Sequence, residues 1–291
     1  MISRLILHSS RFTLYLPQKT MYTEYSPSPL LSPYIDKYWE FKGNPEYGMQ
    51  INILPDGCTD FIFTLGEVAQ ASGHENLMLQ PYRSYFVGAM TRFTTLATYT
   101  ETVHMLGVRF LPCGLLRFIE LPLHELTNQR ISTDELNTPF DDLFTEKLCE
   151  LPHLLARIAF IEKTLIRLLE KNYRIDSQIY QAVQSINLSN GMQSIRSITE
   201  QLCICQRHFE RKFKQHTGYT PKEYSRIMKF KYAVKLLSNC PADNLLSTAV
   251  TAGYYDVPHL SKEIKALSGN TPASFFVLPM PDEITLTYLE A

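Results

Sequence analysis

The feature that most constrains this chain is an internal repeat in its last third. Gly218-Tyr-Thr-Pro221 recurs 51 residues later as Gly269-Asn-Thr-Pro272. Five further positions recur at the same spacing: His208 and His259, Phe209 and Leu260, Phe213 and Ile264, Lys214 and Lys265, and Tyr224 and Phe275. Because polar and apolar positions recur together, we expect two copies of one supersecondary unit.

Each copy has the pattern of a helix-turn-helix. In the first copy, a short helix is expected over 198–202, a turn over 203–205 and a second helix over 206–216. In the second copy, these elements are expected over 245–252, 253–256 and 257–267, with Asp256 as the N-cap of the last helix. Two capping boxes, Ser197-Ile-Thr-Glu200 and Thr220-Pro-Lys-Glu223, predict helix starts. Apolar residues at steps of three and four from Tyr224 to Leu237 predict a long connecting helix.

The second helix of each copy is expected to have one apolar and one basic-polar face. In the first copy the exposed face carries Arg207, Glu210, Arg211 and Lys214, and the buried face carries Phe209, Phe213 and His216. In the second copy the corresponding sets are Pro258, Ser261, Lys262 and Lys265, and Leu260, Ile264 and Leu267. Residues 206–235 hold nine basic and two acidic residues, a local charge of +7 in a chain of net charge −1. This block favours phosphate binding, with a solvated helix surface as the alternative.

Residues 175–277 resemble the AraC/XylS family of bacterial regulators. The segments that match are Cys205-Gln-Arg-His-Phe-Glu-Arg-Lys-Phe-Lys214, Thr217-Gly-Tyr-Thr-Pro221, Ala249-Val-Thr-Ala-Gly-Tyr-Tyr-Asp256 and Ser268-Gly-Asn-Thr-Pro272. The resemblance implies a transcription factor, an activator or repressor, that carries two DNA-reading units in one polypeptide. The chain departs from the family pattern at Cys203, where glycine is usual, and at Cys205, where serine or threonine caps the helix. It also departs at Thr248, Leu260 and Ile264, which makes the grip of the second unit less secure.

The family pattern also implies which residues meet double-stranded DNA. In the first unit, Gln206, Arg207, Glu210 and Arg211 are expected to face bases or phosphates. In the second unit the expected residues are Val257, Pro258, His259 and Lys262, a set poor in hydrogen-bond donors. Lys214 and Lys265 are expected to contact phosphates. RNA polymerase is a further partner that the resemblance suggests.

The first half of the chain has a different texture. Short β-branched and aromatic runs, broken by turns such as Pro55-Asp56-Gly57, predict a small β-barrel or sandwich. Residues 22–135 resemble an uncharacterised domain found ahead of AraC-type helix pairs, with the sequence Leu54-Pro-Asp-Gly-Cys58 as one matching segment. By analogy it is expected to sense a small molecule. The candidate ligand-binding residues are Trp39, Asp56, Asp60 and Arg109, and for most of them a core or turn role is the competing interpretation.

These patterns define an α+β chain of two domains. Residues 1–20 are expected to be a disordered extension, 21–172 a β-rich domain, and 173–291 an all-helical DNA-binding domain with units at about 195–218 and 244–269. Apolar residues at helical spacing from Leu154 to Leu169 end the β-rich domain. This helix is expected either to cover the sheet or to form a homodimer contact, and a domain that only oligomerises is the alternative to a sensor.

Other function classes have little support in the sequence. The scattered cysteines include no C-x-x-C pair, and no apolar run approaches the ~20 residues of a membrane span. We therefore expect a cytoplasmic protein with no membrane partner, metal or cofactor. An enzyme alternative is a DNA-repair alkyl-transfer domain with a zinc-held cysteine, but Cys58, Cys113 and Cys149 have no clustered metal ligands in the sequence. No catalytic residue is expected.

Overall fold

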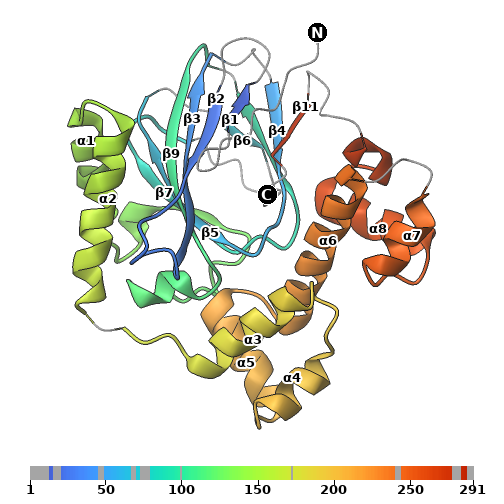
Figure 1. Ribbon diagram of the computed structural model, residues 1–291. Helices are drawn as coiled ribbons and strands as arrows, with labels where there is room; N and C mark the ends of the chain where they lie inside the picture. Colours follow the sequence, from blue (N-terminus) through green and yellow to red (C-terminus); the bar gives the residue numbers. More distant parts are fainter. Residues whose placement is uncertain are drawn as a thin grey trace.

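The structure is a computed structural model that describes residues 13–15, 21–44, 49–66, 70–72, 79–98, 100–171, 173–239, 244–276 and 283–286. Its N-terminal part is β-rich and its C-terminal part is helical, as predicted (Figure 1). No helix in the described part of the chain is long and apolar enough to cross a membrane. Within the extension expected to be disordered, Thr13–Tyr15 instead forms a strand, because its backbone pairs with residues 21–23.

Two sheets form the N-terminal domain. The larger sheet has the order β1-β2-β3-β9-β5-β7-β10, with bounds Thr13–Tyr15, Met21–Tyr25, Ile35–Gly43, Val103–Phe110, Thr59–Thr64, Ser84–Val87 and Arg130–Ser132. The smaller sheet has the order β11-β4-β8-β6, with bounds Glu283–Leu286, Met49–Ile53, Thr94–Thr98 and Gln70–Ser72. The sheets do not close on each other, so of the two predicted architectures the open, two-sheet arrangement is the one observed.

Strand alternation gives the larger sheet two apolar faces. In β5, Phe61 and Phe63 face a core that includes the helices α1 (Asp142–Glu150) and α2 (Leu154–Leu169). Ile62, between them, faces a second core that includes Leu96 of the smaller sheet. The domain therefore has three layers: the small sheet, the large sheet and a helical layer (Figure 1).

The amphipathic helix α2 covers the large sheet. Its buried residues Ile158, Ile161, Leu165 and Leu168 all belong to the core that it shares with β5 and β9. Of the two roles expected for this apolar face, covering the sheet is the one observed. The face is consequently not available for a homodimer contact.

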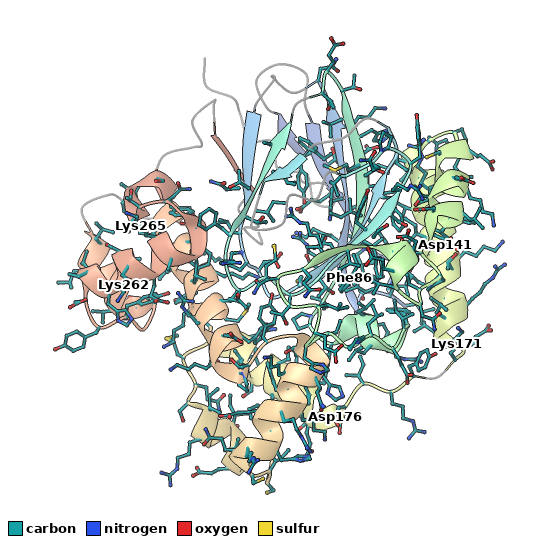
Figure 2. All side chains as sticks on the ribbon, turned by 180° about the vertical axis from the view of Figure 1, so that it is seen from behind. Phe86, Asp141, Lys171, Asp176, Lys262 and Lys265 are labelled. Atoms are coloured by element: carbon teal, nitrogen blue, oxygen red, sulfur yellow. The ribbon has the colours of Figure 1, made fainter. Side chains whose placement is uncertain are left out.

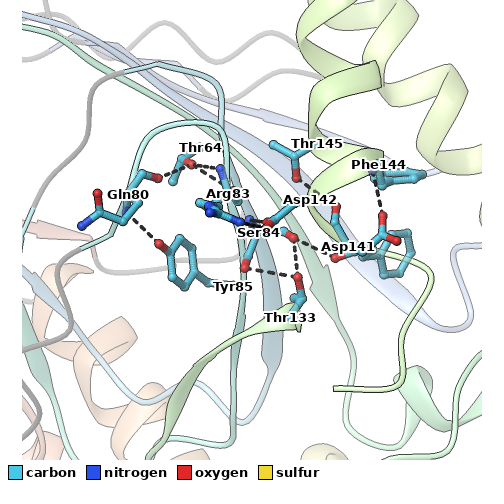
Figure 3. A network of polar contacts seen from close by, with 11 residues as sticks. Thr64, Gln80, Arg83, Ser84, Tyr85, Thr133, Asp141, Asp142, Phe144 and Thr145 are labelled. Atoms are coloured by element: carbon cyan, nitrogen blue, oxygen red, sulfur yellow. Dashed lines mark hydrogen bonds and ion pairs between the residues drawn. The ribbon is translucent and has the colours of Figure 1, made fainter. Parts of the chain in front are cut away.

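A polar network fastens α1 to the large sheet (Figure 3). Ser84 donates from its hydroxyl to the Phe140 carbonyl at 2.8 Å, and its backbone N–H donates to Asp142 at 3.3 Å. Arg83 also forms an ion pair with Asp142. Asp141 caps α1 by accepting from the Phe144 N–H at 2.9 Å. These contacts are far from the helical domain and hold the layers of the N-terminal domain together.

The C-terminal domain consists of two helix pairs joined by one long helix. Its helices are α3 (Ser177–Leu188), α4 (Ile195–Gln201), α5 (Gln206–Thr217), α6 (Pro221–Asn239), α7 (Leu245–Thr251) and α8 (Val257–Ser268), followed by the 3₁₀ turn η4 (Pro272–Phe275). One core joins α3, α4, α5 and the start of α6, and a separate core joins the rest of α6 to α7 and α8. The predicted tandem arrangement, with a connecting helix packed against both units, is therefore present.

The expectation of a wholly helical C-terminal domain is wrong at its end. Glu283–Leu286 is strand β11, which pairs in parallel with β4 in the register Glu283–Gln50 to Leu286–Ile53. The physical reason is tertiary: β4 has a free edge, and a short extended segment satisfies its backbone groups. The chain thus returns to the N-terminal domain after its helical part (Figure 1).

Candidate nucleic-acid interface

Helix α5 exposes the face that the sequence predicted. Phe209 and Phe213 are fully buried, with their rings 5.5 Å apart. The predicted DNA-facing residues are all exposed: Gln206, Arg207, Glu210, Arg211 and Lys214. His216 is half-buried, and its Nδ1 lies 2.8 Å from the Lys212 carbonyl oxygen. An α-helix with one packed face and one face of donors has the shape and chemistry that the major groove accepts.

Contacts along α5 orient its polar side chains. The Gln206 amide donates to Glu210 Oε1 at 2.8 Å, so the carboxylate fixes the direction of this amide. Arg211 Nη2 lies 3.2 Å from His208 Nδ1. His208 itself is exposed. These contacts restrict the exposed polar side chains of α5, which would lower the entropy cost of binding a ligand at this face.

Helix α8 exposes the matching face with poorer chemistry. Pro258, His259, Lys262 and Lys265 are exposed and Val257 is partly buried, whereas Leu260, Ile264 and Leu267 are fully buried. Lys262 and Lys265 lie at the end of the molecule away from α1 and α2 (Figure 2). Ser261, which the sequence pattern placed on this face without marking it as a DNA contact, holds the position that matches Glu210. Tyr255, just before the helix, was not predicted and is 88% exposed.

The two units differ in how their turns and caps are built. Asp256 caps α8 by accepting from the His259 N–H at 2.8 Å, whereas Cys205 makes no side-chain cap bond to α5, as its thiol predicted. In the turns, Cys203 has φ 51° where Gly253 of the second unit has φ 76°. A cysteine in this left-handed region carries a strain that glycine does not.

The predicted start of α4 is wrong by three residues. The helix begins at Ile195, because the Ser194 hydroxyl accepts from the Ser197 N–H at 3.1 Å and so supplies the cap. Glu200 pairs with Arg196 instead of completing a box with Ser197. The second box is confirmed: the Thr220 N–H donates to Glu223 at 2.8 Å, and the Glu223 N–H donates to Thr220 at 3.2 Å.

Helices α5 and α8 each form an ion pair with a neighbouring segment, and the charges of the pair are reversed between the two units. Lys212 of α5 lies 2.6 Å from Asp176, the N-cap of α3. At the matching position of α8, Glu263 pairs with Arg226 of α6. Partial burial raises the pKa of Asp176, but the hydrogen bonds from Lys212 and the Ile179 N–H, with the Lys212 charge, outweigh burial and leave that pKa below its usual value.

The four candidate ligand residues form one buried network in the N-terminal domain. Trp39 Nε1 donates to Asp60 at 2.7 Å, and Arg109 Nε donates to the same carboxylate at 3.2 Å. Arg109 Nη1 lies 2.9 Å from Asp56 Oδ2. Burial raises the pKa of Asp60, while the Arg109 charge opposes that rise. The four residues chosen from the sequence therefore lie together, and most of their hydrogen bonds and ion pairs are with one another.

A small apolar cavity of about 40 Å³ lies beside this network, between the two sheets. Trp39, Asp60 and Arg109 line it, together with Arg130 of β10 and mostly apolar residues. Within the described residues, the Arg130 side chain has no hydrogen bond or ion pair, and burial lowers its pKa to about 10 despite the nearby Asp60 charge. Nothing in the sequence around Arg130 marked it, because only strand pairing brings it to the cavity.

A larger cavity of about 320 Å³ lies where the two domains meet. Asp56 and Cys58 line it from the N-terminal side, and Tyr224, Met228 and Lys231 line it from α6. Burial and the Asp56 charge raise the pKa of the Cys58 thiol well above its usual value. Among the described residues, no group of three or more His, Cys, Asp or Glu side chains is placed to hold a metal ion.

Comparison with known proteins agrees with this division of the chain. Residues 198–276 match the family described as a helix-turn-helix domain, and residues 23–132 match a domain family of unknown function, DUF6597. Comparison with curated proteins gave no match.

Several solved structures are similar in part. ToxT from Vibrio cholerae aligns at 10% identity over 82% of this chain and 97% of its own, with a TM-score of 0.48. A probable AraC family transcriptional regulator from Rhodopseudomonas palustris aligns at 20% identity over 34% of this chain and 94% of its own, with a TM-score of 0.31. The C-terminal domain of AraT, a response regulator from Geobacillus stearothermophilus, aligns at 20% identity over 35% and 85%, with a TM-score of 0.33.

The matched helix-turn-helix residues include both paired units and the connecting helix α6. The match therefore falls on the elements that expose two similar helices, each with a buried apolar face. Residues 198–276 therefore form the helix-turn-helix domain of a DNA-binding transcription regulator, and a separate N-terminal domain of unknown function precedes it.

Proposed function

We propose that the two units bind one duplex with different tasks. Gln206, Arg207, Glu210 and Arg211 of α5 read base edges, and Lys214 contacts a phosphate. Val257, Pro258, His259 and Lys262 of α8 follow the groove mainly by shape, with Lys265 on a phosphate. The observation that carries this proposal is the exposed polar face of α5 directly opposite its buried Phe209 and Phe213.

Salt dependence tests this proposal directly. DNA fragments selected by the full chain from a random-sequence library are used to measure affinity at increasing salt. Because several lysines and arginines would displace counterions, log affinity is expected to fall steeply and linearly with log salt concentration. The Lys214→Ala variant is expected to reduce the slope by about one unit and to leave sequence preference unchanged. A flat salt response of the wild-type chain would contradict the proposal.

The proposed partners beyond DNA are RNA polymerase and a second copy of the chain, within the bacterial cytoplasm. Since the apolar face of α2 is occupied by its own sheet, a homodimer would need another surface. Sedimentation velocity of the full chain, with and without its selected DNA, measures the stoichiometry. A single protomer on the DNA at every concentration would remove the homodimer from this proposal.

For the N-terminal domain, we propose that it binds a small molecule at the cavity beside Arg130. The domain offers an apolar wall with a partly buried guanidinium that has no partner in the described structure, next to the Asp60–Arg109 pair. Such a group favours a ligand with an apolar body and a hydrogen-bond acceptor, most simply a carboxylate. At about 40 Å³ the cavity must widen to take it, and the flexible Met90 and Met105 side chains on its wall can move.

Thermal denaturation of the full chain against a panel of apolar carboxylic acids tests this ligand site. Binding to the folded state raises the melting temperature by mass action. The Arg130→Met variant replaces the guanidinium with an unbranched apolar side chain. It is expected to show no increase in melting temperature with the acids. Equal shifts in the wild-type and variant chains would move the ligand elsewhere, and no shift with any acid would favour a domain that only mediates assembly.

A further inference from the structure

The N-terminal domain touches both DNA-reading units through the same short loop, residues 54–58. Leu54, at its start, is 4% exposed and belongs to the core of the second unit, with Phe230 and Leu260. Gly57, three residues later, faces the first unit's core. A Cβ atom at Gly57 would lie 2.7 Å from the Tyr224 ring and 2.9 Å from Met228. Loop 54–58 therefore spans the boundary between the two units.

A second loop, residues 88–93, makes the same double contact. A Cβ atom at Gly218, which ends α5, would lie 2.7 Å from Ala89, and the Tyr219 hydroxyl donates to the Met90 carbonyl at 3.2 Å. At the other end of the loop, Phe93 packs against Gly269, which ends α8, with 2.7 Å to a Cβ placed there. Gly218 and Gly269 are the repeat-related turn glycines, so one loop supports the same point of both units.

Within the DNA-binding domain itself, the connection between the units is narrower. Their cores are separate clusters, joined by α6 and by Met192 packed against Gly253. Each core is also completed from the N-terminal domain: Ala89 and Cys113 enter the first, and Leu54 and Phe93 enter or border the second. The angle between α5 and α8 thus depends on residues more than 100 positions away in the sequence.

We infer that loops 54–58 and 88–93 are positioning elements for DNA recognition. They hold the two units at one mutual orientation, so the N-terminal domain sets the spacing between the two DNA segments that the protein accepts. Packed interfaces have discrete arrangements rather than a continuous range, which makes such a setting selective. Both loops also border the proposed ligand cavity, through Met90 and through the Asp56–Arg109 pair. The inference about spacing holds whether or not that cavity takes a ligand.

The test measures spacing preference rather than affinity alone. DNA selected by the wild-type full chain is footprinted to locate its two contacted segments, and one base pair is then inserted or removed between them. Each base pair changes the separation by about 3.4 Å and the rotation by roughly 35°. Phe93→Ala removes the contact with the second unit and alters no residue of the DNA-binding domain. We expect it to reduce the wild-type spacing penalty by about threefold or more, within the range of known coupling effects.

Two further variants keep the test decisive. Thr127→Val removes the 2.6 Å hydrogen bond from the Thr127 hydroxyl to the Gly218 carbonyl at nearly constant volume, and it is expected to act in the same direction more weakly. Phe160→Ala is the matched control, since it removes a partly buried aromatic side chain of the same domain that stacks on Phe144. It is expected to keep the wild-type spacing penalty. The inference is overturned if folded Phe93→Ala and Thr127→Val proteins, verified by circular dichroism, show the wild-type penalty or lose affinity equally at every spacing.

Discussion

The two helix-turn-helix units share a backbone plan but distribute their strengths in opposite ways. The first has the more polar exposed face, with Arg207 and Arg211 exposed on α5, yet this helix lacks a side-chain cap. The second has the Asp256 cap and a glycine in its turn, yet Val257 and Pro258 occupy its leading positions. The exposed arginines are thus found in the first unit, and the side-chain cap that stabilises the helix is found in the second.

Two copies of one backbone repeat can therefore differ in their exposed side chains and in how their helices are capped. In the first unit the more polar exposed helix face occurs together with an uncapped helix start and a non-glycine turn residue. The first unit is supported from outside instead, because its closing turn at Gly218 and Tyr219 is buried under the N-terminal domain. The second unit, whose Gly269 is exposed apart from Phe93, relies more on its own caps.

The largest expected difference between the units is in DNA affinity. Arg211→Ala is expected to weaken binding to selected DNA by about 1–3 kcal/mol, because a bidentate contact to guanine would be lost. Lys262→Ala, at the matching position of α8, is expected to cost less than about 1 kcal/mol and to weaken all sequences alike. Gel shifts with single-base variants of the selected DNA measure both effects. Equal loss on every sequence for Arg211→Ala would break the assignment of reading to the first unit.

The next difference concerns the caps. Asp256→Ala removes the acceptor for the His259 N–H and is expected to destabilise α8 by about 1 kcal/mol. Cys205→Ser supplies an acceptor that α5 lacks and is expected to stabilise that helix by up to about 1 kcal/mol. Hydrogen exchange of the first-turn amides of α5 and α8 reports local opening. If the new serine does not slow hydrogen exchange in α5, the missing cap does not reduce the local stability of that helix.

A smaller effect is expected at the turns. Cys203→Gly relieves the left-handed strain at φ 51° and is expected to stabilise the first unit by roughly 0.5–1 kcal/mol, after the added freedom of the unfolded chain is subtracted. Gly253→Ala imposes that strain on the second unit and brings a Cβ to 3.1 Å from Met192. Melting temperatures of the two variants should therefore move in opposite directions. A lower melting temperature for Cys203→Gly would show that the turn carries no strain.

The smallest effect is the acid dependence of the Lys212–Asp176 brace. Because the pKa of Asp176 in the folded chain lies below its usual value, its stabilisation is complete above the unfolded value of 3.8 and is lost as pH falls through the folded value. The pair is partly exposed, so the contribution stays below about 1 kcal/mol. Asp176→Asn keeps a capping side chain and should flatten stability in this acidic window. If the pH dependence of stability is the same in the Asp176→Asn variant and the wild-type chain, the Lys212–Asp176 pair does not contribute to stability in this range.

The sequence predicted the helical domain well because its signals are local. The Asp256 cap and the Thr220 box each involve residues within a few positions of one another, and the repeat can be read from the sequence because it recurs at one fixed spacing. The start of α4 was misplaced because Ser194 and Ser197 are both acceptable caps, and tertiary packing of Ile195 and Ile198 selects the earlier one. Local chemistry alone does not separate such alternatives.

The candidate ligand site was predicted in part, for the same reason. Trp39, Asp60 and Arg109 stand out as polar or amphipathic residues in apolar strands, and strand pairing brings them together. Arg130 and loop 88–93 gave no signal, since their roles arise from contacts between segments far apart in the chain. Strand β11 was missed because four residues acquire an extended structure only when an edge is present to receive them.

That last strand has a practical consequence for dissecting the protein. The DNA-binding domain is inserted, in sequence terms, between two pieces of one β-sheet, because β4 and β11 are partners. If the chain is cut only at the interdomain linker, the C-terminal fragment carries β11 without its partner, and the N-terminal fragment has β4 as an open sheet edge. An unpaired strand and an open edge both favour aggregation. A fragment that stops after Phe276 does not carry β11 and so avoids the unpaired strand.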